Sequence, residues 1–359
     1  MLRPYNGSGC VDGNNKMDAV RSAADCSGYI GEILSESLQC GFSCCLPFNG
    51  MNWKIKALIQ SALANFPSGL SYDIYYKVQR NWGGLKAPSL VGMAVAIDGW
   101  DQLVNQGCDP SDKVFFEVGT GRTPLIAISF WLMGARSTVT FDLNPYLKEE
   151  LTQEVLQALL DNSAATQQQF GARLLPERYA QLAALVRSRP RLQDVLQLCQ
   201  IRYLAPGDAR QTDLASDSVD VHFSNNVMEH VPSNDLSKIL QEARRILKPQ
   251  GLALHHVDYV DHFSYSDPSI SSVNFLRFSE RQWKWWAGNR YMYMNRLRHD
   301  DYLGLFDKAG LKLRSDDFER DENACKQIER QEILLDAAFK NIAADRLAIS
   351  RAWIVTAKN

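Results

Sequence analysis

Histidine and aspartate residues gather in one short stretch of this chain, between His255 and His262. The stretch begins inside an apolar run, residues 252–257, that has the character of a buried strand. A neutral imidazole accepts a proton near neutral pH, and a neighbouring carboxylate can orient the ring. We therefore predict His262 as a general base toward a hydroxyl group and His256 as the second candidate, with the carboxylates of Asp258 and Asp261 as orienting groups.

The same residue types also permit a metal site. Imidazole and carboxylate groups bind transition metals, and carboxylates bind Mg²⁺. A plausible set of metal ligands consists of His256, Asp258, Asp261 and His262. A metal site therefore remains an alternative to the general-base interpretation, and no residue is assigned as a metal ligand. None of the eight cysteines belongs to a Cys-x-x-Cys pair, so a cysteine zinc site is not indicated and free thiols are expected.

Aromatic residues follow the histidine stretch, and planar polar groups come after them. The aromatic residues are Trp283, Trp285, Trp286, Tyr291 and Tyr293. Flat aromatic faces can stack on a sugar ring, while amide and guanidinium groups bind hydroxyls. Core packing is the competing explanation for each tryptophan. We predict substrate contacts from a mixed set of polar and aromatic residues: Asp258, Tyr293, Asn295, Arg296 and Arg298.

A glycine-rich turn lies much earlier, where Glu117-Val118-Gly119-Thr120-Gly121 follows an apolar strand at 114–116. A helical segment at 125–133 comes next, and a second strand at 138–141 delivers Asp142. Glycine lacks a Cβ atom, so its backbone can approach a ligand, and a carboxylate at a strand end suits a ribose diol. The pattern indicates a nucleotide-binding βαβ unit, although Pro124 replaces the third glycine of the dinucleotide motif.

Four further motifs follow in order over the next hundred residues. They are Gly207-Asp208-Ala209 after a third strand, Ser224-Asn225 and Glu229-His230-Val231 around a fourth, and Arg245-Ile-Leu-Lys-Pro-Gln-Gly251 before a fifth. With the glycine-rich turn and Asp142, this series resembles the class I S-adenosylmethionine (AdoMet)-dependent methyltransferases. Thr123 stands where that family has a third glycine, and Gln250 where glycine is common.

The resemblance implies a fold, a cofactor and a set of cofactor-binding residues. The fold is α/β and Rossmann-like, with a seven-stranded, mostly parallel sheet and one antiparallel strand. Asp142 would bind the ribose hydroxyls of AdoMet, Asp208 the adenine amino group, and Asn225 the methionine part or the substrate. The complete set carried over from the family is Glu117, Gly119, Thr120, Gly121, Asp142, Leu143, Asp208, Ala209 and Asn225.

The chain divides into three parts by composition and periodicity. Residues 1–50 are rich in Gly, Ser, Asn and Cys and are expected to be poorly ordered or atypical. Residues 51–112 form a helical leader or cap, and 113–359 the methyltransferase domain, with a helical insert at 147–200 and a substrate segment at 255–300. A helix is expected at 333–343 and a last strand at 350–357.

The expected activity is O-methylation of a sugar, glycan or related small-molecule hydroxyl. The substrate segment resembles methyltransferases of bacterial surface-polysaccharide synthesis through Asp261-His262-Phe263-Ser264 and the 274–279 and 293–298 segments. A lipid-linked or natural-product acceptor (O-, N- or C-methylation) and a non-catalytic AdoMet-binding module remain alternatives. The net charge of −2 argues against nucleic acid, and no signal or membrane-spanning run is seen, so a cytoplasmic location is expected; the oligomeric state is left open.

Overall fold

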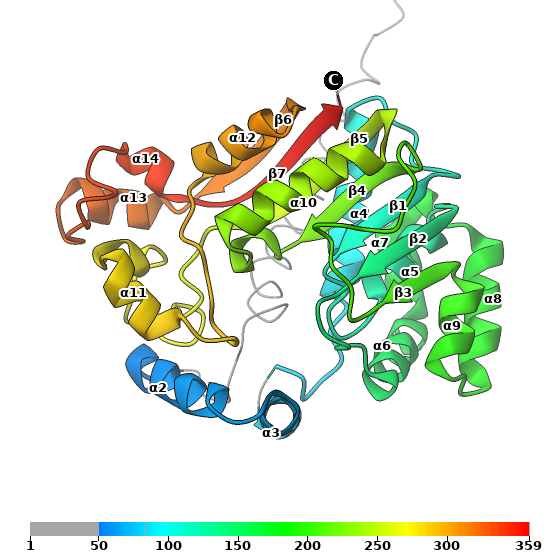
Figure 1. The fold of residues 1–359 in the computed structure, drawn as a ribbon. Helices are drawn as coiled ribbons and strands as arrows, with labels where there is room; N and C mark the ends of the chain where they lie inside the picture. Colours follow the sequence, from blue (N-terminus) through cyan, green and yellow to red (C-terminus); the bar gives the residue numbers. More distant parts are fainter. Residues whose placement is uncertain (1–49, 83, 359) are drawn as a thin grey trace, which may run out of the picture.

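A single seven-stranded sheet forms the centre of the computed structural model, which describes residues 50–82 and 84–358 (Figure 1). The prediction for residues 1–50 therefore lies outside the described residues, apart from Gly50. The strand order is β3-β2-β1-β4-β5-β7-β6, and only β7 runs antiparallel to its neighbours. The strands are β1 (Val114–Val118), β2 (Ser137–Phe141), β3 (Ile201–Leu204), β4 (Val219–Asn225), β5 (Leu247–Asp258), β6 (Leu311–Arg320) and β7 (Ile349–Lys358).

The central strands are buried on both faces because successive side chains alternate between two helical layers. Phe115 packs into a core with α4 (Val91–Asn105) and α5 (Leu125–Leu132). Phe116 points the other way, into a core with α10 (Ser233–Ile246) and α12 (His299–Lys308). This period of two explains why these strands appear as continuous apolar runs in the sequence.

The helical insert lies between β2 and β3, as predicted. Its helices are α6 (Glu149–Asp161), α7 (Ser163–Phe170), α8 (Pro176–Arg187) and α9 (Leu192–Leu198), with a 3-10 turn, η2 (Gly171–Arg173). They extend the core around α5, because Leu159, Phe170 and Leu182 are fully buried in it. Among the described helices, none is both long and apolar enough to cross a bilayer.

A third core joins the helical leader to the segment after β5. The leader holds α2 (Trp53–Ala64) and α3 (Ser68–Trp82), and the later segment holds η4 (Asn274–Arg277) and α11 (Glu280–Ala287). The ring of Trp53 lies 5.4 Å from Phe263 and 4.8 Å from Trp286 between centroids. Trp283 is 3% exposed and its Nε1 donates to the carbonyl oxygen of Met294. The competing explanation, core packing, therefore holds for Trp283.

The helix predicted at 333–343 is wrong. That stretch consists of turns, and the helices nearby are α13 (Glu322–Glu329) and the short α14 (Ala344–Leu347). The side chain of Asp336 accepts a hydrogen bond from the Ala338 N–H, which replaces a helical bond with a local turn. Asp321 instead caps α13 by accepting from two backbone N–H groups of its first turn.

Candidate active site

A cleft of about 650 Å³ opens at the carboxyl ends of β1, β2 and β4. This is the edge at which parallel α/β sheets bind ligands. Residues of the leader, from α3 and the start of α4, form its opposite wall, as does Tyr293 of the later segment. Eight of the nine predicted cofactor residues line it: Gly119, Thr120, Gly121, Asp142, Leu143, Asp208, Ala209 and Asn225.

Gly119 occupies a position that excludes any side chain. Its φ of +84° lies in the left-handed region, and its N–H donates to the carbonyl oxygen of Phe141 at 2.8 Å. A Cβ atom at this position would lie only 2.4 Å from Cγ2 of Val227, which also lines the cleft. The glycine therefore brings the β1 loop against the segment after β4 and closes that side of the cleft.

We expect Gly119→Ala to lower both the melting temperature and the affinity of the cleft for AdoMet. The left-handed conformation costs a residue with a Cβ about 1–2 kcal/mol, and the displaced Val227 disturbs the cleft wall. Gly107→Ala is the matched control, because Gly107 has φ +74° but no described atom within 4 Å of a Cβ at that site. Thermal unfolding and calorimetric titration measure both effects; equal behaviour of the two variants would contradict the packing role.

Asp142 is held at the end of β2 with its carboxylate at the cleft. Oδ2 accepts from the Gly121 N–H at 3.0 Å, and Oδ1 accepts from the Asn144 N–H at 3.2 Å. Burial raises the pKa of Asp142 to about 6, and these backbone bonds oppose the rise. The carboxylate keeps lone pairs for a ligand, since each oxygen can accept a second hydrogen bond.

Glu117 is the one predicted cofactor residue that does not line the cleft. It is 3% exposed, and its carboxylate accepts from the Thr140 hydroxyl at 2.7 Å. Thr140 in turn lies 2.5 Å from the hydroxyl of Thr120, which does line the cleft. Burial raises the pKa of Glu117 to about 7. In this structure Glu117 positions the glycine-rich loop through Thr140.

Asp208 and Asn225 differ in how free their oxygens are. The Arg210 guanidinium lies 2.7 Å from Oδ2 of Asp208 and holds the pKa of that carboxyl below its ordinary value. Asn225 is 8% exposed, and its Oδ1 finds no hydrogen-bond partner among the described residues. A buried amide oxygen without a partner is costly, so a ligand donor in the cleft is the group that Asn225 fits.

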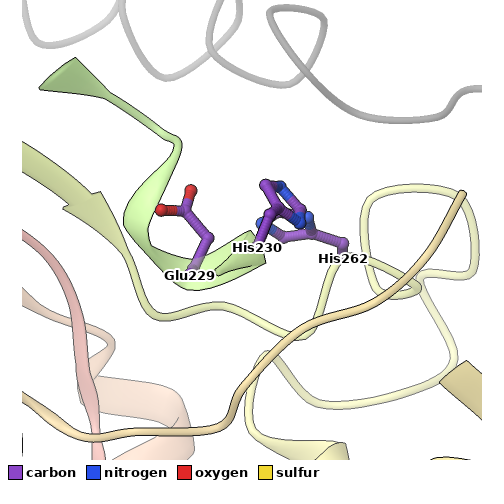
Figure 2. A group of neighbouring side chains, drawn as sticks. All are labelled: Glu229, His230 and His262. Atoms are coloured by element: carbon purple, nitrogen blue, oxygen red, sulfur yellow. The ribbon is translucent and has the colours of Figure 1, made fainter. Parts of the chain in front are cut away.

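His230, from the Glu229-His230-Val231 motif, lines the cleft. His230 ends the 3-10 turn η3 (Met228–His230), and its ring lies 4.9 Å from the ring of His262 between centroids. Figure 2 shows Glu229 and His230 on this turn and His262 on the loop after β5. Burial, together with the neighbouring His262, lowers the pKa of His230 to about 4, so the ring is neutral at pH 7.

His262, the first base candidate, lies behind His230 and does not line the cleft. Its Nε2 is 3.3 Å from Oδ2 of Asp258, close enough for an ion pair. Asp258 also accepts from the Tyr265 hydroxyl at 2.5 Å and from the Val260 N–H at 2.9 Å. The predicted pairing of His262 with a carboxylate therefore exists with Asp258, one of the two carboxylates expected to orient the ring.

The side chains of the other two catalytic candidates make their hydrogen bonds to other groups. His256 Nδ1 contacts Oδ1 of Asn226 at 2.7 Å, and burial lowers the pKa of His256 to about 4 rather than leaving it near neutrality. Asp261 accepts from the Phe263 N–H and the Asn274 amide, which fixes the loop after β5. The alternative metal set of His256, Asp258, Asp261 and His262 is not brought together as one group.

Of the predicted substrate residues, only Tyr293 lines the cleft. Asn295 donates to the carbonyl oxygens of Met228 and Val231 and so fixes η3. Arg296 donates to two backbone carbonyls near η4 and pairs with Glu280. Arg298 donates to three backbone carbonyls at the ends of β5, α14 and β7. These three polar side chains therefore hydrogen-bond to the backbone of the protein itself.

Tyrosines supply the aromatic lining of the cleft, and sequence reasoning missed most of them. The lining set is Tyr72, Tyr75, Tyr146, Tyr291 and Tyr293. The rings of Tyr75 and Tyr291 stack at 4.5 Å between centroids, and the Tyr146 hydroxyl donates to that of Tyr72 at 2.7 Å. Two of them come from the leader, where tyrosines spaced by three along a helix were the available signal.

The strand order, the single antiparallel strand and the cleft at the carboxyl edge define a Rossmann-like class I methyltransferase fold. Residues 166–255 match the family model described as a methyltransferase domain. The matched segment includes Asp208, Asn225 and His230 and begins after the glycine-rich loop.

Two solved structures illustrate the likeness. An S-adenosylmethionine-dependent methyltransferase from Mesorhizobium loti is 12% identical, with a TM-score of 0.38 over 73% of this chain and 100% of that one. Geranyl diphosphate C-methyltransferase from Streptomyces coelicolor A3(2) is 11% identical, with a TM-score of 0.42 over 74% of this chain and 80% of that one. No curated protein sequence matches the chain.

Proposed function

We propose that this protein binds AdoMet in the cleft and transfers its methyl group to a hydroxyl of a sugar, glycan or related small molecule. The observation that carries the proposal is the meeting of three features in one cavity of about 650 Å³. These are the glycine loop at Gly119, the Asp142 carboxylate, and the amide oxygen of Asn225, which has no hydrogen-bond partner among the described residues. A volume of this size suits a cofactor with part of a second ligand.

Polar groups of the cleft match separate parts of AdoMet. Asp142 would accept from the ribose hydroxyls, and Asn225 would accept from the ammonium of the methionine part. The backbone at Gly119 and Gly121 leaves room for that part to lie against the loop. Asp208 would reach the adenine amino group only with an oxygen shared with Arg210. When bound, AdoMet supplies a methyl group on a positively charged sulfur.

The acceptor would be activated at the part of the cleft wall that His230 forms. A hydroxyl is a weak nucleophile until its proton is removed or its oxygen is polarised. The neutral ring of His230 faces the cleft, with His262 and Asp258 behind it. Tyrosine faces and hydroxyls around the cleft supply apolar contact and hydrogen bonds of the kind a sugar ring needs.

AdoMet affinity is expected to fall as the pH drops through about 6. Asp142 accepts the ribose hydroxyls best as a carboxylate, and its pKa in the ligand-free protein is raised to about 6 by burial. Affinity is therefore fully present above this pKa and lost below it, by about tenfold between pH 7 and pH 5. Calorimetric titrations between pH 5 and 8 measure this. Asp142→Asn should flatten the profile, and a flat wild-type profile would contradict the assignment.

The acceptor class is tested by incubating the protein with methyl-labelled AdoMet and a panel of acceptors. The panel contains free sugars, oligosaccharides, a lipid-linked saccharide and small aromatic alcohols, and mass spectrometry locates the added methyl group. The proposal expects an O-methylated saccharide. Label on carbon or nitrogen, or only on the lipid-linked acceptor, would favour the alternative acceptors. Fractions of a cell lysate are tested as further acceptors. If the protein binds AdoMet but methylates nothing in the panel or in these fractions, a non-catalytic module is favoured.

A further inference from the structure

Three side chains beside the cleft converge in a way that the methyl-transfer proposal does not explain. Glu229, His230 and His262 each offer one ligand atom, and these atoms all lie within 4.8 Å of one another (Figure 2). Two come from η3 and one from the loop after β5, so the fold joins residues more than thirty positions apart. Among the described residues, these three are the group of histidine and acidic side chains whose ligand atoms lie close enough together to bind one metal ion.

Glu229 carries the strongest sign of a missing partner. It is 1% exposed, and neither carboxylate oxygen has an aligned hydrogen-bond partner among residues 50–82 and 84–358, although the backbone N–H groups of Glu229 and Asp258 lie close enough to lower its pKa slightly against the effect of burial. A second carboxylate, Asp258, lies close enough to raise the pKa of Glu229, adding to the larger effect of burial. Buried polar groups in folded proteins are almost always paired, and a buried carboxylate is commonly paired with a cation or a metal ion.

The two imidazoles are arranged to present lone pairs. His230 Nδ1 lies 2.8 Å from the carbonyl oxygen of Tyr293, which can only accept, so Nδ1 carries the proton and Nε2 is free to bind. His262 Nε2 lies 3.3 Å from Oδ2 of Asp258 and has no aligned hydrogen-bond partner among the described residues. A carbonyl on one histidine and a carboxylate beside the other are typical outer partners of metal-binding imidazoles.

We propose that Glu229, His230 and His262 bind one divalent transition-metal cation, of the class of Zn²⁺ or Co²⁺. Two imidazoles and one carboxylate favour these ions over Mg²⁺ and Ca²⁺, which prefer sets made of oxygen ligands. A 2+ charge balances the Glu229 carboxylate together with the nearby Asp258. The set differs from the one predicted from sequence, since Glu229 and His230 replace His256, Asp258 and Asp261 as ligands.

The site adjoins the cleft, because His230 is part of both. Three protein ligands leave a coordination position open, as in catalytic zinc sites. If the proposed methyl transfer holds, a hydroxyl oxygen bound there would lose its proton more readily, since a bound cation lowers the pKa of its oxygen ligand. This role rests on the proposed function, whereas the existence of the metal site does not.

The test is metal binding by the full chain, measured without any methyl acceptor. The protein is stripped with a chelator, dialysed, and titrated separately with Zn²⁺, Co²⁺ and Mg²⁺, with bound metal counted by elemental analysis. We expect one equivalent of Zn²⁺ or Co²⁺ and much weaker Mg²⁺ binding. Bound Co²⁺ should show weak visible bands without an intense thiolate band, which separates this site from the cysteines. Binding of less than one equivalent, or a thiolate band alone, would overturn the proposal.

Variants show whether the metal sits at these residues. Loss of an outer partner alone costs about 10–100-fold in affinity, so Glu229→Gln and His262→Ala should each cost at least about 100-fold. His299→Gln is the matched control, because His299 is equally buried but pairs with Asp316 outside the group. Unchanged affinity in Glu229→Gln and His262→Ala would contradict the site even if the wild type binds metal.

The melting temperature with and without metal provides a second test, which still applies if a variant is less stable than the wild type. Metal at about 100 times its Kd should raise the wild-type melting temperature by about 4–8 °C and leave that of Glu229→Gln unchanged. Without metal, Glu229→Gln should melt no lower than the wild type, because the replaced carboxyl has no aligned hydrogen-bond partner among the described residues and the amide has a similar size. A metal-free Glu229→Gln that melts lower would contradict the inference. AdoMet titration of the stripped protein separately reports whether the cofactor proposal stands.

Discussion

Replacing Asp142 with alanine is expected to weaken AdoMet binding by about 10²–10⁴-fold. The carboxylate stands at the cleft with its orientation fixed by the Gly121 and Asn144 N–H groups. Each hydrogen bond to a charged acceptor contributes about 1.5–3 kcal/mol, and a ribose diol makes two of them. Their loss amounts to about 3–6 kcal/mol, which converts to the stated fold-change. Calorimetric titration with AdoMet measures it directly.

Asp208→Ala provides the comparison within the same cleft. Its carboxylate is already paired with Arg210, and both side chains are well exposed, so the net loss on removal should be several-fold smaller than at Asp142. Both variants should unfold cooperatively near the wild-type temperature. The assignment of the ribose site fails if Asp142→Ala binds AdoMet within threefold of the wild type, or if Asp208→Ala proves the more damaging change.

The second large effect is expected in turnover rather than in binding. His262→Ala should reduce methyl transfer by about 10–100-fold, because its ring does not line the cleft and acts as an outer partner through His230. The ring lies against His230 on the acceptor side of the cleft and contacts none of the predicted AdoMet residues. AdoMet affinity should therefore stay within about threefold. This expectation holds whether His262 moves a proton or binds a metal.

His299→Gln serves as the control for losing a buried imidazole. Its ring pairs with Asp316 and the Tyr259 hydroxyl, and it does not line the cleft. Single-turnover rates with saturating AdoMet, corrected for the folded fraction, compare the two variants. Near wild-type turnover in His262→Ala would remove this residue from the acceptor chemistry, and an equal fall in His299→Gln would show that the loss is structural.

The sequence could predict the parts of the site that depend on local order. The glycine loop, the strand before it and Asp142 lie within about thirty residues, so the βαβ pattern alone places them at one edge of the sheet. The leader is helical as its periodicity indicates, and α4 spans Val91–Asn105 within it. The predicted sheet with one antiparallel strand is confirmed by the strand order and pairing.

The acceptor side could not be predicted in this way because it depends on contacts between distant segments. His256 and Asp258 are two residues apart on β5, yet only Asp258 faces His262, while His256 contacts Asn226 of the neighbouring strand end. Arg296 and Arg298 suit a ligand by residue type, but their terminal Nη groups donate to backbone carbonyls of the fold. Composition identifies such groups without showing which partner occupies them.

The central claim is that this cleft is an AdoMet site, and the most direct test is calorimetric titration of the full-length wild-type protein with AdoMet at pH 7.5. We expect one site per chain with a Kd between about 1 μM and 1 mM, the range in which enzymes hold their substrates, and competition by S-adenosylhomocysteine. Absence of binding at millimolar AdoMet by a folded protein would contradict the account.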